Sequence, residues 1–106
     1  MVLNRDYIEA NDGWEVLQYA IVEQAVEDYK KSMVYLVHHK RPKRIKTKKQ
    51  AEEAKMWDYN QKMRKDCERF FRSNWYAKLT DIDGERVIQE LRDQIRYRAF
   101  AFEEET

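Results

Sequence analysis

Apolar residues recur every three or four positions over residues 14–38, a spacing typical of an amphipathic helix. The stripe they form consists of Leu17, Ile21, Val22, Ala25, Val26, Tyr29, Met33 and Leu36. Most charged side chains of this segment fall beside or opposite the stripe. Asp12 precedes the pattern, and Asp is a favoured helix N-cap. We therefore predict a helix over residues 14–38 that buries one face.

The same spacing returns over residues 47–72. The stripe of this second segment consists of Met56, Tyr59, Met63, Cys67 and Phe70. Thr47 and Gln50 have the spacing of a capping box, in which each side chain bonds a backbone N–H at the helix start. Pro42 ends the first helix, because a proline disfavours helical backbone at the residue before it. The pattern predicts a second helix over 47–72 and a loop over 39–46.

Two further helices are expected after this pair. Ser73 is placed to cap a short helix over residues 74–79, and either Thr80 or Asp83 is placed to cap a longer one over 83–101. The apolar positions of the longer helix are Val87, Ile88, Leu91 and Ile95. Its stripe predicts a third wall for the helical core.

The aromatic segment FFRSNWY occupies residues 70–76. Its position at the end of the second helix and in the next turn predicts that the rings belong to the core, near Trp14. The alternative is an exposed platform on which the bases of a single strand stack.

The overall pattern predicts one all-α domain: a long antiparallel helical hairpin with a short third helix and a C-terminal helix packed on it. The sequence has 106 residues with only two glycines and one proline, a composition that favours helices. The two long helices should pack antiparallel, because a short connection joins them. We expect residues 1–13 to form an arm or a short helix, and 102–106 to form a tail.

The most concentrated charge lies in the predicted loop and its flanks, where residues 38–49 read HHKRPKRIKTKK. We call this segment the basic tip. Its seven cations are Lys40, Arg41, Lys43, Arg44, Lys46, Lys48 and Lys49. The chain has a net charge of +1 and the tip contributes +7, so the remainder carries −6. Such clusters bind nucleic-acid phosphates, largely through the release of condensed counterions.

Tyr35, just before the tip, is placed to stack on a base. Contact with an acidic protein and simple solvation of the loop are the alternatives to nucleic-acid binding.

The sequence has no catalytic, cofactor-binding or metal-binding signature. His38 and His39 are adjacent and would diverge on a helix, and no nearby residue completes a metal site. The single cysteine, Cys67, lies on an apolar stripe and excludes an intramolecular disulfide. No stretch is long and apolar enough to predict a membrane span. We expect a cytoplasmic protein that is not an enzyme and needs no metal or cofactor.

Two segments resemble a group of small proteins carried by phages, prophages and conjugative elements of Gram-positive bacteria. Residues 20–33 contain an A-V-x-D-Y pattern that Ala25, Val26, Asp28 and Tyr29 match. Residues 67–91 contain the pattern F-F-R-S-x-W-[YF]-x-x-L-T-x-I-D-G-E. Its matching positions are Phe70, Phe71, Arg72, Ser73, Trp75, Tyr76, Leu79, Thr80, Ile82, Asp83, Gly84 and Glu85. The two segments together hold 39 of the 106 residues.

The resemblance implies a mobile-element accessory protein in a bacterial host cell, a class that includes anti-CRISPR inhibitors. We therefore expect a non-enzymatic protein that binds nucleic acid, or a nucleoprotein such as an RNA-guided nuclease of the host, through the basic tip. Inhibition of that nuclease is the most specific form of this expectation. The alternatives are a structural or dimerisation module that forms a homodimer, and a DNA-binding regulator with no inhibitory role.

Overall fold

A computed structural model describes residues 13–105 of the chain, with side chains as far as residue 96. Its helices are α2 (Gly13–His38), α3 (Lys48–Phe71), α4 (Asn74–Leu79) and α5 (Gly84–Glu105). The described residues contain no strand. The predicted all-α fold is confirmed.

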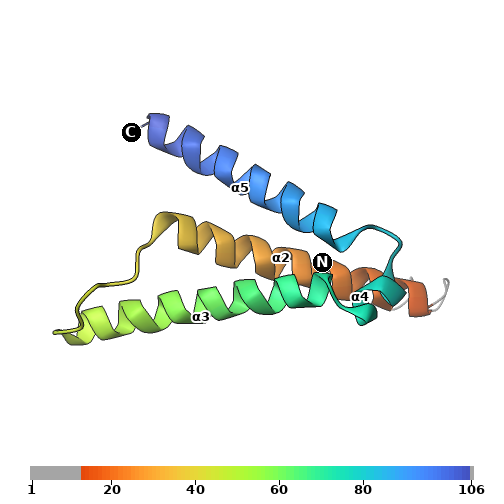
Figure 1. The fold of residues 1–106 in the computed structure, drawn as a ribbon, viewed down its shortest axis with the longest axis horizontal. Coiled ribbons are helices and arrows are strands. Elements are labelled where there is room, and N and C mark those ends of the chain that lie inside the picture. The colour runs from red at the N-terminus through yellow and green to blue at the C-terminus, as the bar shows by residue number, and fades with distance from the viewer. Residues whose placement is uncertain (1–12, 106) are drawn as a thin grey trace.

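The two long helices α2 and α3 form an antiparallel hairpin, and α5 runs beside α2 in the same direction (Figure 1). The loop between α2 and α3 lies at one end of the molecule's long axis, and α4 lies at the other (Figure 1). The molecule measures 55 × 31 × 27 Å, with a radius of gyration of 17.3 Å. A compact domain of this length would have a radius of about 13 Å. The elongated shape therefore sets the basic tip apart from the opposite end, where α4 lies.

Local sequence signals explain where the helices begin. Thr47 caps α3, its Oγ1 accepting the N–H of Gln50 at 3.1 Å in the predicted capping box. Ser73 caps α4 by accepting the N–H of Tyr76, also at 3.1 Å. Asp83, rather than Thr80, receives the N–H of Glu85 at the start of α5. The predicted cap Asp12 lies outside the described residues, as does the predicted arm at 1–13 except for Gly13, which begins α2.

The core gathers where α2, α3, α4 and α5 meet, and its buried members are Tyr29, Cys67, Phe71, Tyr76, Ile88 and Leu91. Phe71 lies 5.9 Å from Tyr29 and 5.6 Å from Tyr76, measured between ring centroids. Trp75 packs edge-on against Trp14 and stays half-exposed. The aromatic segment thus contributes to the core, as its position predicts, although Trp75 lies at the margin.

A close backbone approach joins the end of α3 to the start of α5. Gly84 is buried, and a Cβ on it would overlap the carbonyl oxygen of Phe71. Only glycine therefore fits this corner without displacing backbone.

The predicted buried face of α3 is wrong over its first half. Met56 is 51% exposed and Tyr59 is 60% exposed, whereas the polar residues Asn60 and Glu68 are buried. On α2, the predicted stripe residue Leu17 is likewise 48% exposed.

Over the second half of α3 the prediction holds, because Cys67 is buried and Met63 and Phe70 pack against the core. Glu68 is buried beside them, and its carboxylate finds partners on α2 and α5.

The last helix differs from its predicted end. It continues to Glu105, whereas the pattern predicts a helix to 101 and a tail over 102–106.

Candidate nucleic-acid interface

The basic tip spans the last residue of α2, the connecting loop and the first two residues of α3. All seven of its cations are exposed. The loop that carries most of them protrudes at the far end of the hairpin (Figure 1). The fold therefore brings the predicted site residues to one end of the molecule, away from the core.

One of the seven cations, Arg41, has a carboxylate partner within the chain. Its Nε lies 3.0 Å from Oδ1 of Asp58, and its Nη2 lies 3.3 Å from Oδ2. This two-pronged hydrogen bond raises the pKa of Arg41 and holds the pKa of Asp58 below its ordinary value. Arg41 thus ties the loop to the third turn of α3, and its charge is offset locally.

The other six cations have no carboxylate within ion-pair distance among the residues whose side chains the structure describes. They are Lys40, Lys43, Arg44, Lys46, Lys48 and Lys49. We refer to them as the six unpaired cations. Each side chain is exposed, so an external phosphate can reach all of them.

The start of α3 fixes the second half of the loop. Oε1 of Gln50 accepts the backbone N–H of Lys46 at 2.8 Å and that of Thr47 at 3.2 Å. The first backbone N–H groups of a helix, here those of Lys48 and Lys49, have no carbonyl partner within the helix. They add partial positive charge at the same place as two lysine side chains.

Tyr35 is only partly available to stack on a base. Its ring is stacked on the ring of His39, with centroids 4.0 Å apart and planes inclined by 10°. Nδ1 of His39 lies 2.9 Å from the backbone oxygen of Tyr35. Because a carbonyl oxygen only accepts, this nitrogen carries the proton. One face of Tyr35 is thus covered within the chain.

A buried carboxylate joins the three long helices near the end of α3 that is remote from the tip. Glu68 of α3 is 7% exposed, and its carboxylate accepts hydrogen bonds from Tyr29 of α2 at 2.9 Å and from Arg92 of α5 at 2.8 Å. Arg64, one turn earlier on α3, donates to the same carboxylate at 2.8 Å. Nε of Arg92 also donates to the Tyr29 hydroxyl at 3.2 Å. We call these four residues the Glu68 cluster.

The electrostatics of the Glu68 cluster favour the charged carboxylate. Burial alone would raise the pKa of Glu68, but the hydrogen bonds from Arg92 and Tyr29 and the nearby arginine charges lower it overall. Burial raises the pKa of Tyr29, and the hydrogen bond from Arg92 opposes that rise. The cluster therefore holds a carboxylate anion, a neutral phenol and two guanidinium cations at neutral pH.

A groove of about 330 Å³ lies next to this cluster. It is lined by Met33, Leu36 and Val37 of α2, Trp57, Gln61 and Arg64 of α3, and Arg92 and Arg96 of α5. We call it the Trp57 groove. Its walls combine an indole ring and aliphatic side chains with three arginines, and no acidic residue lines it.

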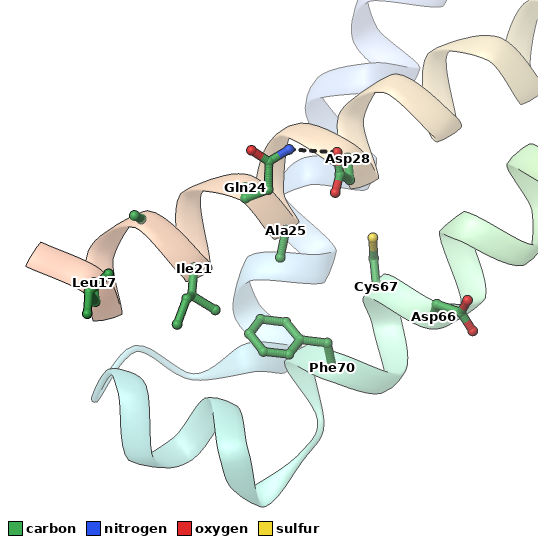
Figure 2. Close-up of a pocket in the computed structure, with 9 residues that line it drawn as sticks. Leu17, Ile21, Gln24, Ala25, Asp28, Asp66, Cys67 and Phe70 are labelled. Carbon is green, nitrogen blue, oxygen red and sulfur yellow. Dashed lines mark hydrogen bonds between the residues drawn. The ribbon is translucent and has the colours of Figure 1, made fainter. Parts of the chain in front are cut away.

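A second cavity, of about 470 Å³, lies between α2 and α3 (Figure 2). Leu17, Ile21 and Phe70 give it an apolar surface, while Asp28 and Asp66 lie at its edge (Figure 2). Cys67 points into it, and burial together with the nearby acidic side chains raises the pKa of this thiol to about 11. We call it the Cys67 groove. Its acidic edge makes it a poor surface for phosphates.

Sequence reasoning missed the Glu68 cluster and the Trp57 groove. A signal was present, because Arg64, Glu68 and Arg72 follow one another at intervals of four on one side of a helix. The partners on α2 and α5 are 39 and 24 residues away from Glu68. Nothing in the sequence pairs them before the fold is known.

The described residues contain no group of three or more histidine, cysteine or acidic side chains placed to hold a metal ion. Over the same part of the chain, none of the helices is long and apolar enough to cross a membrane.

Comparison of the chain with family models, curated proteins and solved structures finds no match to any of the three.

Proposed function

We propose that this protein is a non-enzymatic accessory protein that binds nucleic acid, or a nucleoprotein, through its basic tip. The observation that carries the proposal is the set of six unpaired cations, exposed together at one end of an elongated helical body. Exposed lysines on the body of α3, such as Lys55, Lys62 and Lys65, also have no described carboxylate partner, so what sets the tip apart is its concentration of charge: seven cations within twelve residues and no acidic residue among them. The six unpaired cations at the tip are accessible to an external anion.

The tip is held in shape before it meets a partner. Arg41 attaches one part of the loop to Asp58, and Gln50 attaches another part through two backbone N–H groups. A loop ordered in advance loses less conformational entropy when it binds. Phosphate contacts made by these lysines and by Arg44 release counterions and set the affinity.

The negative charge of the remaining chain favours one orientation of the protein on a polyanion. Outside the tip the sequence carries −6. A polyanion is therefore attracted to the end of the rod and repelled from most of its sides. We expect the protein to meet nucleic acid end-on, with α4 and most of the hairpin held away from it.

The test is a titration of fluorescently labelled 20-base-pair duplex and 20-nucleotide single strand, followed by anisotropy at two salt concentrations. If five tip cations contact phosphates, the affinity for duplex falls with a log–log salt slope of about −4.5. The variant Lys43→Glu/Arg44→Glu/Lys46→Glu should lose binding to both.

A matched control reverses the same number of charges on the body of α3. The variant Lys55→Glu/Lys62→Glu/Lys65→Glu changes three exposed lysines away from the tip. It should retain more of the affinity than the tip variant. Absence of binding at low salt, or equal losses in the two variants, overturns the proposal.

A narrower form of the proposal names the nucleoprotein as an RNA-guided nuclease of a bacterial host, which the protein inhibits. It is supported by the resemblance to mobile-element proteins at residues 20–33 and 67–91. Cleavage assays with purified effectors of several types, with and without the protein, test it. Inhibition by the native chain but not by the tip variant supports it, and unchanged cleavage by every effector contradicts it.

One observation favours a different function, self-association through the hairpin. Met56 and Tyr59 of α3 are exposed and continue, at helical spacing, the apolar wall of the Cys67 groove. Sedimentation over a range of concentrations tests this alternative. A dimer that Tyr59→Glu dissociates supports it.

A further inference from the structure

The Trp57 groove has the composition of a small ligand site that combines stacking with charge. Its volume of about 330 Å³ is at the lower end of the range of ligand pockets, which suits a single planar group. The indole of Trp57 and the aliphatic side chains of Met33 and Leu36 supply apolar surface. Arg64, Arg92 and Arg96 supply hydrogen-bond donors that match phosphate oxygens.

The charges around the groove do not cancel. Arg64 and Arg92 share the carboxylate of Glu68. Arg72, which also pairs with Glu85, lies 3.7 Å from that carboxylate. Two guanidinium cations that line the groove thus meet one anion. Arg96 adds a third cation, and none of the described carboxylates lies within ion-pair distance of it. The arginines therefore retain an excess of positive charge that an external anion can balance. The positions of Arg64 and Arg92 are fixed by hydrogen bonds, so little ordering is needed on binding.

The groove adjoins the basic tip. Leu36 and Val37 of its wall belong to the last three residues of α2, which ends where the loop begins. Trp57 precedes Asp58, the residue that anchors Arg41 of the loop. Along α3, the distance from Lys49 to Trp57 is about 12 Å at 1.5 Å per residue. A few nucleotides of an extended strand span that distance.

We infer that the Trp57 groove takes an unpaired nucleobase of a single strand whose neighbouring phosphates lie on the arginines and on the basic tip. The inference rests on the proposed function and names its ligand class: single-stranded rather than duplex nucleic acid. Aromatic rings and arginines are the groups on which single-stranded bases stack in proteins that bind them. A base inside a duplex is stacked on its neighbours and cannot enter the groove.

The test compares single-stranded and duplex oligonucleotides of equal length with the variants Trp57→Ala and Arg96→Gln. Trp57→Ala should weaken single-strand binding at least about fivefold and leave duplex binding unchanged. Arg96→Gln should reduce the single-strand salt slope by about 0.7. Trp75→Ala, at the opposite end of the molecule, is the matched control and should alter neither affinity.

A second measurement does not depend on the stability of Trp57→Ala. In a Trp14→Phe/Trp75→Phe background, Trp57 is the remaining tryptophan of the chain. Its fluorescence should be quenched when single-stranded oligonucleotide saturates the protein, and not by duplex.

The outcomes separate the two proposals. If both oligonucleotide forms bind through the tip, but Trp57→Ala lowers both affinities equally or neither, and the Trp57 emission does not change, the groove proposal is overturned and the tip proposal stands. If no oligonucleotide binds, the tip proposal fails and the groove proposal fails with it.

Discussion

The two ends of the hairpin differ in how their cations are paired with carboxylates. At the end where α3 meets α5, Arg64 and Arg92 converge on Glu68, and each contact is 2.8 Å long. At the tip, Arg41 has such a partner in Asp58, and the six unpaired cations have none among the described side chains. The comparison shows that the arginines around Glu68 are paired within the fold, whereas the tip concentrates cations without adding acidic residues to pair them.

The contrast is reinforced by the polarity of α3. Lys48 and Lys49 occupy the positive end of the helix, where each opposes the helix dipole by about 0.3–1 kcal/mol in exposed positions. A helix start selected for stability would carry acidic residues there. Lys48 and Lys49 thus slightly lower the stability of α3, and their presence there supports a role of the tip in binding.

The largest effect on stability is expected from Gly84→Ala at the α3–α5 corner. The added methyl group meets the carbonyl oxygen of Phe71, which is backbone and cannot rotate away. We expect a loss of about 3 kcal/mol or more in the free energy of unfolding, above the ordinary range for overpacking. Chemical denaturation measures it, and a loss below about 1 kcal/mol would show that the corner is not tightly packed.

The next largest effect is expected from Glu68→Gln, which leaves Arg64 and Arg92 without their shared anion. Both arginines are partly exposed, so we expect a loss of about 2–3 kcal/mol at neutral pH. The folded protein lowers the pKa of Glu68. Its contribution is therefore complete above the unfolded value of about 4.3 and is lost as the pH falls through the lower folded value. The stability difference between the native chain and this variant should shrink in that acidic range; a difference independent of pH would contradict the assignment.

A smaller effect is expected from removing one buried hydroxyl, and the chain offers a matched pair. The Tyr29 hydroxyl donates to Glu68 and accepts from Arg92, whereas the buried Tyr76 hydroxyl has no hydrogen-bond partner among the described residues. Tyr29→Phe should lower the free energy of unfolding by about 1–2 kcal/mol, and Tyr76→Phe should leave it equal or slightly raise it. Equal losses in the two variants would show that the Tyr29 bonds contribute no specific stability.

The smallest effect on stability is expected at the tip. Lys43→Glu/Arg44→Glu/Lys46→Glu removes exposed charges that have no carboxylate partner among the described side chains, so the free energy of unfolding should change by less than about 0.5 kcal/mol. Thermal melting measures this, and the same sample should have lost its affinity for oligonucleotides. A large loss of stability would show that the tip belongs to the packed structure.

The local features of this fold could be predicted from the sequence because they depend on residues a few positions apart. The cap of α3 requires only Thr47 and Gln50, and that of α4 requires only Ser73 and a backbone N–H. The exposure of the basic tip also followed from its charge and from Pro42.

The exposure of the first half of the α3 stripe and the burial of Glu68 could not be predicted in this way. Met56 and Tyr59 have large hydrophobic side chains and Asn60 and Glu68 have polar ones, so the sequence alone places the first two in the core. The structure exposes the first two and buries the second two. Burial of Glu68 becomes favourable only once Tyr29 and Arg92 are placed around it by the tertiary fold. The Trp57 groove depends on the same arrangement, since its walls come from α2, α3 and α5.

The buried thiol of Cys67 is a chemical probe for the separation of α2 from α3. With a pKa of about 11, roughly one molecule in ten thousand carries the thiolate at pH 7, and the side chain is only 6% exposed. An alkylating reagent should therefore modify Cys67 chiefly during moments when α2 and α3 separate. The labelling rate then measures how often the two helices separate. A ligand that binds at the tip should slow the labelling only if it also holds α2 and α3 together.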